Sequence, residues 1–217
     1  MIPLKDDNPT RSFPFINIGL ILINVAVFFY QVALPPRVAT ALVLQNATVP
    51  ARISAAVTGH APLALAFEPL FTSMFLHSGL MHLLGNMLFL WIFGDNVEDA
   101  FGHILYLLFY LFCGIGSGLL HVLFNLTSHI PAIGASGAIS GVMGAYIVLF
   151  PRARVLTFFF IFLVPVPAFF ILGYWFLLQF VGALAQFGTV SNGGVAIWAH
   201  VGGFIMGLLI TLLFKRR

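Results

Sequence analysis

Apolar runs of about twenty residues follow one another along this chain, and they restrict its fold more than any other sequence feature. A helix of roughly 20 mostly apolar residues can cross the hydrocarbon core of a bilayer. Only 7% of the 217 residues are charged, whereas a soluble domain has about 25%, so the chain cannot cover a water-facing surface. We therefore predict an all-α membrane protein, folded as one domain over residues 1–217 and surrounded by the lipid bilayer.

The apolar runs predict a bundle of six transmembrane helices. Their approximate ranges are 13–34, 79–93, 101–124, 135–150, 167–186 and 195–214. The second and fourth are short and rich in small residues, which suits helices enclosed by protein. Pro165 and Pro167 interrupt the run before the fifth helix, so residues 155–164 are expected to form a buried or interfacial loop. The longest connection, residues 35–72, is moderately apolar and is expected at the membrane interface.

The distribution of Lys and Arg predicts the orientation of the chain. Six helices place both termini on one side, together with the connections at 94–100 and 151–154. That side collects seven of the nine basic residues, which are Lys5, Arg11, Arg152, Arg154, Lys215, Arg216 and Arg217. Only Arg37 and Arg52 lie on the other side. Because basic residues accumulate in cytoplasmic loops, both termini are predicted to be cytoplasmic, in a plasma or inner membrane.

The positions of the acidic residues argue against several functions. The six carboxylates are Asp6, Asp7, Glu68, Asp95, Glu98 and Asp99, and all are expected outside the spans. An aspartyl intramembrane protease needs two aspartates inside helices, and an ion-coupled transporter usually keeps an acid in the membrane. The sequence has no HExxH, so a zinc metalloprotease of that type is excluded, and no basic block is suited to nucleic acid.

Three short motifs carry the polar groups that could perform chemistry. Ser136 lies in the sequence GASG at 134–137, which opens the fourth predicted helix. His82 and Asn86 lie near the start of the second helix, and His200 lies near the start of the sixth. These three helices run in the same direction through the membrane. The four side chains are therefore expected at similar depths, near the outer ends of their helices.

Glycines on two helix faces predict that the fourth and sixth helices pack closely. The spaced glycines are Gly134, Gly137, Gly141 and Gly144 in the fourth helix, and Gly203 and Gly207 in the sixth. Small residues let membrane helices approach each other at short distance. Since His200 lies on the same face as the GxxxG pair of the sixth helix, close packing would bring it to the Ser136 hydroxyl.

The predicted arrangement is suited to nucleophilic catalysis. A serine hydroxyl is a weak nucleophile until a base removes its proton, and the imidazole of His200 can accept and later donate that proton. With no acid expected nearby, Ser136 and His200 would form a dyad. His82 and Asn86 share one helix face and could donate to a developing oxyanion. The backbone N–H of Ser136, at a helix N-terminus, would be a third donor.

Each motif also has a purely structural interpretation. Small residues are common at interfaces between membrane helices, and a lone histidine in a span is often a satisfied polar group. Ser140 lies one turn after Ser136 and is the rival nucleophile. His77 and His82 are close in sequence, but no third metal ligand is evident, so neither a metal nor a cofactor is predicted. The expected position of all four polar side chains of these motifs at one membrane depth favours a catalytic interpretation over a structural one.

In these motifs the chain resembles the rhomboid family of intramembrane serine proteases. The resemblance rests on His82 and Asn86 as HxxxN, on Ser136 in GxSG, and on His200 followed by Gly203 and Gly207. It implies hydrolysis of a peptide bond in or next to the transmembrane helix of a single-pass substrate protein. The catalytic serine and histidine of the family then fall on Ser136 and His200, and its oxyanion residues on His82 and Asn86.

The chain departs from the family pattern at two places. Many members carry a Trp-Arg pair in the first external loop, where Glu68-Pro69 stands here. Many carry an aromatic residue four positions after the serine, packed against the histidine, where Ser140 stands here. Two other functions compete with the protease. One is a catalytically silent relative that binds membrane proteins or acts in their quality control, but such relatives lack the serine or the histidine, and this chain has both. The other is a small transporter or channel, and the absence of carboxylates from the predicted spans argues against it.

Overall fold

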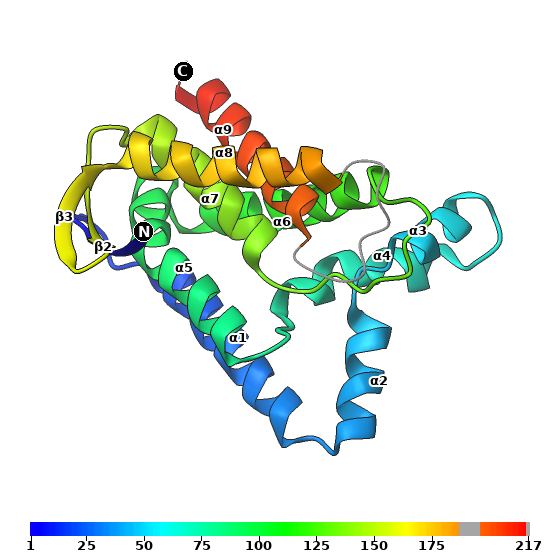
Figure 1. Ribbon diagram of the computed structural model, residues 1–217. Helices are drawn as coiled ribbons and strands as arrows, with labels where there is room; N and C mark the ends of the chain where they lie inside the picture. Colours follow the sequence, from blue (N-terminus) through cyan, green and yellow to red (C-terminus); the bar gives the residue numbers. More distant parts are fainter. Residues whose placement is uncertain (187–195, 216–217) are drawn as a thin grey trace.

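The computed structural model describes residues 1–186 and 196–215, which form nine α-helices, one short 3₁₀ turn and a small sheet (Figure 1). In chain order the elements are β1 (Ile2–Asp6), α1 (Phe15–Ala33), α2 (Pro36–Asn46), α3 (Pro50–Val57), α4 (Leu63–Thr72), η1 (Ser73–Phe75), α5 (Leu80–Phe101), α6 (His103–Leu123), α7 (Ser136–Leu149), β2 (Arg154–Phe159), β3 (Phe162–Pro167), α8 (Ala168–Gln186) and α9 (Ile197–Lys215). The predicted start of the sixth helix, at residue 195, lies outside the described residues.

Five helices are long and apolar enough to cross a membrane, namely α1, α5, α6, α8 and α9. The chain is therefore a multi-pass membrane protein. The apolar helix α7 has only 14 residues, and at about 1.5 Å per residue it is shorter than the roughly 30 Å of a hydrocarbon core. It contacts α5, α6, α8 and α9, and residues 137–146 are all buried. This is the enclosed position expected for a short, glycine-rich helix (Figure 1).

The helix α5 is longer than the sequence predicts. We expected a helix at 79–93 followed by a loop at 94–100, but α5 continues to Phe101 and ends at Gly102, whose φ is 78°. The expected loop is therefore wrong. A positive φ of this size favours glycine, which explains why the turn into α6 falls at this residue.

Glu98 explains why acidic residues can lie inside α5. Its carboxylate is fully buried and accepts hydrogen bonds from the backbone N–H groups of Ile16, at 3.0 Å, and Asn17, at 2.7 Å. These groups belong to the first turn of α1 and have no acceptor within their own helix. The expectation that every carboxylate lies outside the spans is therefore also wrong, because α5 is a candidate span that contains Glu98.

A three-stranded antiparallel sheet in the order β1-β2-β3 lies at one end of the bundle, beside the N-terminus (Figure 1). The chain is mostly helical, as predicted, but the loop expected at 155–164 is wrong because this segment forms β2 and β3. Pro165 and Pro167 are compatible with this structure because β3 is an edge strand, where proline is tolerated without loss of a central ladder bond.

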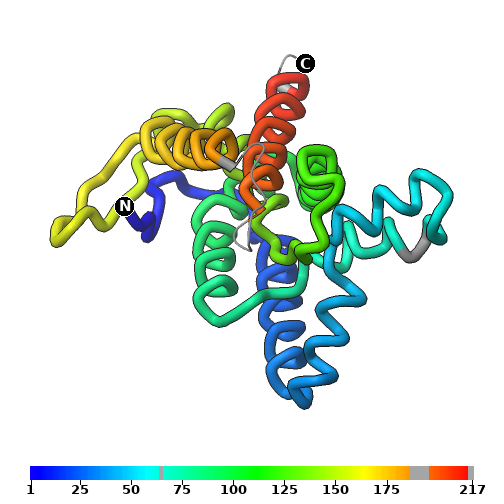
Figure 2. Tube along the Cα trace, turned by 45° about the vertical axis from the view of Figure 1, so that its right-hand side comes forward, coloured from blue at the N-terminus to red at the C-terminus, as the bar shows by residue number. Residues whose placement is uncertain are grey.

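The connection at 35–72 forms three short helices, α2, α3 and α4. The first two begin with proline at their first position, where the missing N–H would have no intrahelical acceptor in any case. The helices α3 and α4 pack on α6 through a small apolar cluster. Its buried members are Ile53, Ala56, Ala66, Leu70 and Val122. Figure 2 shows this segment, in light blue and cyan, projecting to one side of the remaining helices.

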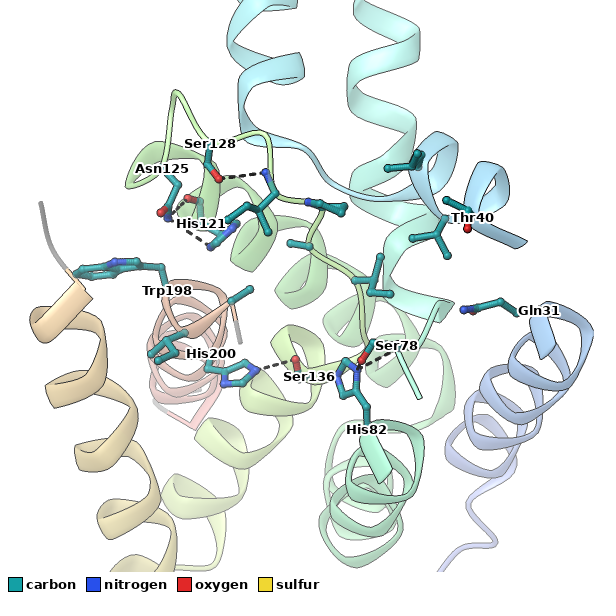
Figure 3. A pocket seen from close by; sticks show the side chains of 18 of the residues that line it. Gln31, Thr40, Ser78, His82, His121, Asn125, Ser128, Ser136, Trp198 and His200 are labelled. Carbon is teal, nitrogen blue, oxygen red and sulfur yellow. Dashed lines mark hydrogen bonds between the residues drawn. The ribbon is translucent and has the colours of Figure 1, made fainter. Parts of the chain in front are cut away.

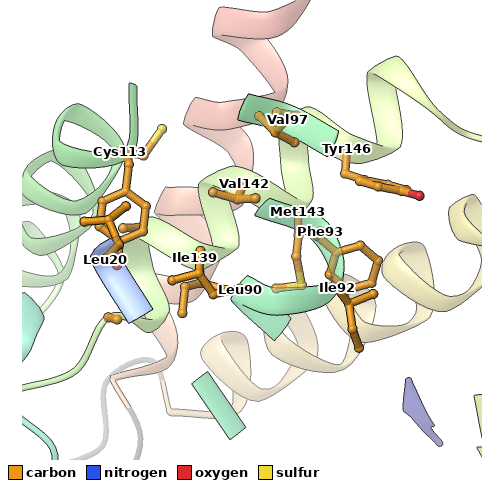
Figure 4. Close-up of a cluster of buried hydrophobic side chains, with 14 of the residues drawn as sticks. Leu20, Leu90, Ile92, Phe93, Val97, Cys113, Ile139, Val142, Met143 and Tyr146 are labelled. Atoms are coloured by element: carbon orange, nitrogen blue, oxygen red, sulfur yellow. The ribbon is translucent and has the colours of Figure 1, made fainter. Parts of the chain in front are cut away.

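The main apolar core includes the contact between α5 and α7. Leu90 and Phe93 of α5 and Ile139, Val142 and Met143 of α7 are all at most 2% exposed (Figure 4). Close packing of such side chains resists displacement of one helix against the other. This core therefore fixes the start of α7, and with it Ser136, relative to α5.

Candidate active site

The three sequence motifs meet beside a cavity of about 1030 Å³. Figure 3 shows His82, Ser136 and His200 side by side, each on a different helix. They belong to α5, α7 and α9 respectively. The far side of the cavity is lined by Gln31 of α1 and Thr40 of α2. The structure therefore brings His82 and His200, which lie 118 positions apart in the chain, to one cavity.

Ser136 and His200 are in direct hydrogen-bonding contact. The Ser136 Oγ atom lies 2.7 Å from the His200 Nε2 atom. Ser136 is the first residue of α7, and His200 lies in the first turn of α9. The histidine is only 8% exposed, so its ring is held by protein on most sides. A base within about 2.6–3.2 Å of a hydroxyl can accept its proton.

Backbone contact between α7 and α9 sets this distance. A Cβ atom added at Gly203 would lie 2.0 Å from the Gly137 carbonyl oxygen, and one added at Gly207 would lie 1.9 Å from that of Gly141. Backbone atoms cannot move aside as the end of a flexible side chain can. The two helices therefore approach as closely as glycine permits, and this approach brings the first turn of α9 to the start of α7.

Ser140, the rival nucleophile, is placed differently from Ser136. Its side chain is fully buried, and its hydroxyl donates a hydrogen bond of 2.6 Å to the Ser136 carbonyl oxygen. Such a bond to the carbonyl four residues earlier is common for serine within a helix. Ser136, in contrast, lines the cavity.

His82 presents a ring N–H toward the segment before Ser136. The backbone N–H of Ser78 lies 3.4 Å from His82 Nδ1 and can only donate, so Nδ1 accepts and the ring proton is on Nε2. A Cβ added at Gly134 would lie 2.8 Å from His82 Nε2. Gly134 also has a φ of 125°, which a side chain would disfavour. Glycine at 134 thus allows His82 to approach the chain that enters α7.

Asn86 adds a second donor at the same place. Its side chain is buried, and within the described part of the chain its Nδ2 atom has no hydrogen-bond partner. A Cβ added at Gly134 would lie 3.6 Å from this atom, so the amide faces the same segment as His82. A buried donor without a partner is costly. An oxygen that develops negative charge beside Ser136 would satisfy it.

Two residues of α8 contact His200, and the sequence analysis assigned neither a role. The Gln179 Oε1 atom lies 2.9 Å from His200 Nδ1, and the ring centroid of Trp175 lies 5.8 Å from that of His200 at an interplanar angle of 34°. A signal was present in the sequence. An amide in an apolar span is expected to have a partner, and Trp175 and Gln179, four positions apart, share one helix face.

His77 lies beside His82, with ring centroids 5.2 Å apart. It precedes α5 and is fully buried, and burial, reinforced by the neighbouring His82, lowers the pKa of His77 to about 4. This histidine is therefore neutral near pH 7. Among residues 1–186 and 196–215, no group of three His, Cys, Asp or Glu side chains is arranged to hold a metal ion.

Comparison with known proteins gives the same family as the motifs. The family model described as the rhomboid domain matches residues 66–217. RHOMBOID-like protein 1 of Arabidopsis thaliana is 34% identical over 148 residues, which cover 68% of this chain and 34% of that protein. The mitochondrial Rhomboid protein 1 of Saccharomyces cerevisiae is 33% identical over 147 residues, which cover 63% of this chain and 39% of that protein.

A bacterial relative matches over a shorter region. Rhomboid protease GluP of Bacillus subtilis is 43% identical over 76 residues, which cover 35% of this chain and 14% of that protein. The matched regions span about a third to two fifths of the length of the plant and yeast relatives. The domain match, in contrast, extends over more than half of this chain. The chain therefore belongs to the rhomboid family.

Proposed function

We propose that this chain is a serine endopeptidase that cleaves peptide bonds in or next to the transmembrane helix of single-pass membrane proteins. The observation that carries the proposal is the 2.7 Å contact between Ser136 Oγ and His200 Nε2 beside a cavity among apolar helices. Membership in the rhomboid family, which includes a relative named as a protease, supports the same function.

In the acylation step, Ser136 Oγ attacks the carbonyl carbon of the scissile peptide while His200 Nε2 takes the hydroxyl proton. The carbonyl oxygen becomes an oxyanion, and the side-chain donors of His82 and Asn86 with the backbone N–H of Ser136 stabilise it. The C–N bond then breaks, and His200 returns the proton to the leaving amine. The product is an acyl-enzyme on Ser136 and a free amino terminus.

In the deacylation step, a water molecule attacks the acyl carbon while His200 accepts one of its protons. The oxyanion forms again beside His82 and Asn86. Collapse of this intermediate breaks the bond to Ser136 Oγ, which regains its proton from His200. The new carboxyl terminus leaves, and the enzyme returns to its starting protonation state.

A second cavity supports entry of the substrate from the lipid side. It has a volume of about 190 Å³ and reaches Ser136 between α5 and α8. Gly85 and Phe89 of α5 and Trp175 of α8 line it together with His82 and Asn86. A peptide that approaches between these two helices would meet the oxyanion donors and the nucleophile together.

The function is tested by incubating the purified chain with a panel of single-pass membrane proteins in liposomes. Wild type is expected to produce two fragments from at least one substrate, and Ser136→Ala none. If wild type and Ser136→Ala bind a protein of the panel equally and neither cleaves any of the panel, the protease function is contradicted. It would favour the alternative of a catalytically silent binding or quality-control factor.

Removal of either side-chain donor to the oxyanion is predicted to reduce activity only in part. Asn86→Ala and His82→Ala are expected to lower kcat, by at most the factor of about 10²–10³ that loss of one donor typically costs, because the remaining donors share the charge. Turnover of a defined substrate is measured together with thermal unfolding. Asn46→Ala, which removes an amide at the end of α2, is the control. Unchanged turnover in the double variant would show that His82 and Asn86 have only structural roles.

For the membrane, we propose six spans with both termini cytoplasmic and the plasma or inner membrane as the location, on the seven-to-two division of Lys and Arg. The chain has a single cysteine, Cys113, which is buried, so introduced cysteines can be labelled selectively. Arg37→Cys is expected to react with an impermeant maleimide on intact cells. Arg216→Cys, outside the described residues, is expected to react only after permeabilisation. The reverse pattern would contradict this orientation.

A further inference from the structure

The histidine of the candidate dyad is held from the side opposite Ser136 by a third helix. Its Nε2 atom faces Ser136, and its Nδ1 atom faces the Gln179 Oε1 atom at 2.9 Å. Gln179 belongs to α8, whereas the two members of the dyad belong to α7 and α9. The ring of Trp175, one turn earlier on α8, lies beside the imidazole. The position of α8 therefore affects how the imidazole of His200, the candidate base, is held.

The chemistry of the amide determines the tautomer of His200. An amide oxygen can only accept a hydrogen bond, so the proton of the neutral ring must lie on Nδ1. The lone pair is then on Nε2, 2.7 Å from the Ser136 hydroxyl, which is the tautomer that can act as a base. In the opposite tautomer, Nε2 would carry the proton and could not accept one from Ser136. The partner of one ring nitrogen thus sets the function of the other.

The close approach of α7 and α9 explains why the support comes from α8. Here a Cβ at Gly203 would lie only 3.2 Å from Ser140 Cβ, so the two helices leave no room for a ring between these positions. Trp175 supplies an aromatic face to His200 from another direction.

We propose that Gln179 is a positioning residue that holds His200 in the tautomer and orientation required of the base, making the dyad a Ser–His–Gln arrangement. This inference rests on the proposed protease function. Gln179 lines neither of the two cavities described above, and its hydrogen bond is to His200 Nδ1, so we expect it to act through His200. Its loss is expected to lower kcat by up to about 100-fold, the cost that a displacement of about 1 Å can have, and to leave KM unchanged.

The test compares Gln179→Met, which keeps the length of the side chain without the acceptor, with Gln179→Glu, which keeps an acceptor and adds a charge. Leu178→Met, at an exposed neighbouring position, is the control. Cleavage of one single-pass substrate and the rate of fluorophosphonate labelling are measured from pH 5 to 9. Gln179→Met is expected to be slow at every pH. Gln179→Glu is expected to recover rate, with the acid limb of kcat/KM moved to higher pH, because a carboxylate stabilises the protonated imidazole.

A second measurement does not depend on turnover. The ¹⁵N chemical shifts of His200 are expected to report the Nδ1–H tautomer in wild type and a mixture of tautomers in Gln179→Met. Wild-type rates and an unchanged tautomer in Gln179→Met would overturn the positioning role while leaving the protease intact. Slow turnover that Gln179→Glu does not restore, accompanied by a lower unfolding temperature in both variants, would show a structural role instead. A wild type that neither cleaves nor labels would overturn the protease and this role with it.

Discussion

Ser136→Ala and His200→Ala are each expected to abolish cleavage and covalent labelling by serine-directed reagents. The hydroxyl of Ser136 is unreactive without a base, and His200 Nε2 is the base in contact with it, at 2.7 Å. In a soluble serine protease, removal of the nucleophile or the base costs on the order of 10⁶ in kcat. The effect here is expected to be of similar size, since both variants remove the same step.

Ser140→Ala is the matched control for this experiment, because it removes the neighbouring hydroxyl from the same helix. The Ser140 hydroxyl is buried and bonded to the Ser136 carbonyl, so it should not react. Intact-protein mass spectrometry after treatment with a fluorophosphonate or an isocoumarin is expected to show one adduct on wild type and on Ser140→Ala. No adduct is expected on Ser136→Ala or His200→Ala. An adduct that persists in Ser136→Ala would assign the nucleophile to another residue.

The sequence signals that point to the candidate site are local. Short motifs at corresponding ends of three helices that run in one direction must share a membrane depth, and glycine spacing indicates which faces can approach. The structure brings Ser136, His200 and His82 to one cavity, while their catalytic roles stay predictions. The sequence does not identify the role of Gln179, because its partner, His200, lies 21 positions away on another helix. No local pattern indicates which neighbour an isolated amide will meet.

The incorrect predictions of the fold also arise from contacts between residues that are distant in the chain. The sequence predicts a loop at 94–100, and a bare carboxylate is costly in an apolar setting. Glu98 instead accepts two N–H groups at the start of α1, 81 and 82 positions earlier. Prolines at 165 and 167 correctly indicate a break in the helical pattern. Whether the segment then forms a loop or an edge strand depends on its pairing with β2 and on β1 from the N-terminus.

Enlarging the glycines of α9 is expected to disable the site without touching a catalytic group. A Cβ at Gly203 would lie 2.0 Å from the Gly137 carbonyl oxygen, and one at Gly207 would lie 1.9 Å from that of Gly141. These are backbone atoms, so α9 must move away from α7. Overpacking of this kind typically costs about 1–3 kcal/mol of stability. Gly203 lies one turn from His200, so even Gly203→Ala should separate His200 from Ser136.

The expected size of this effect follows from the position of the base. A displacement of about 1 Å at a catalytic group can cost roughly 10²-fold in rate, and Gly203→Leu or Gly207→Leu should cost at least as much as the alanine variants. Gly19→Ala in α1 is the control, because a Cβ there meets nothing within 4 Å. Substrate turnover, labelling rate and unfolding in detergent are measured for each variant. Full activity in Gly203→Leu and Gly207→Leu, at unchanged stability, would mean that the contact of α7 with α9 does not set the distance between Ser136 and His200.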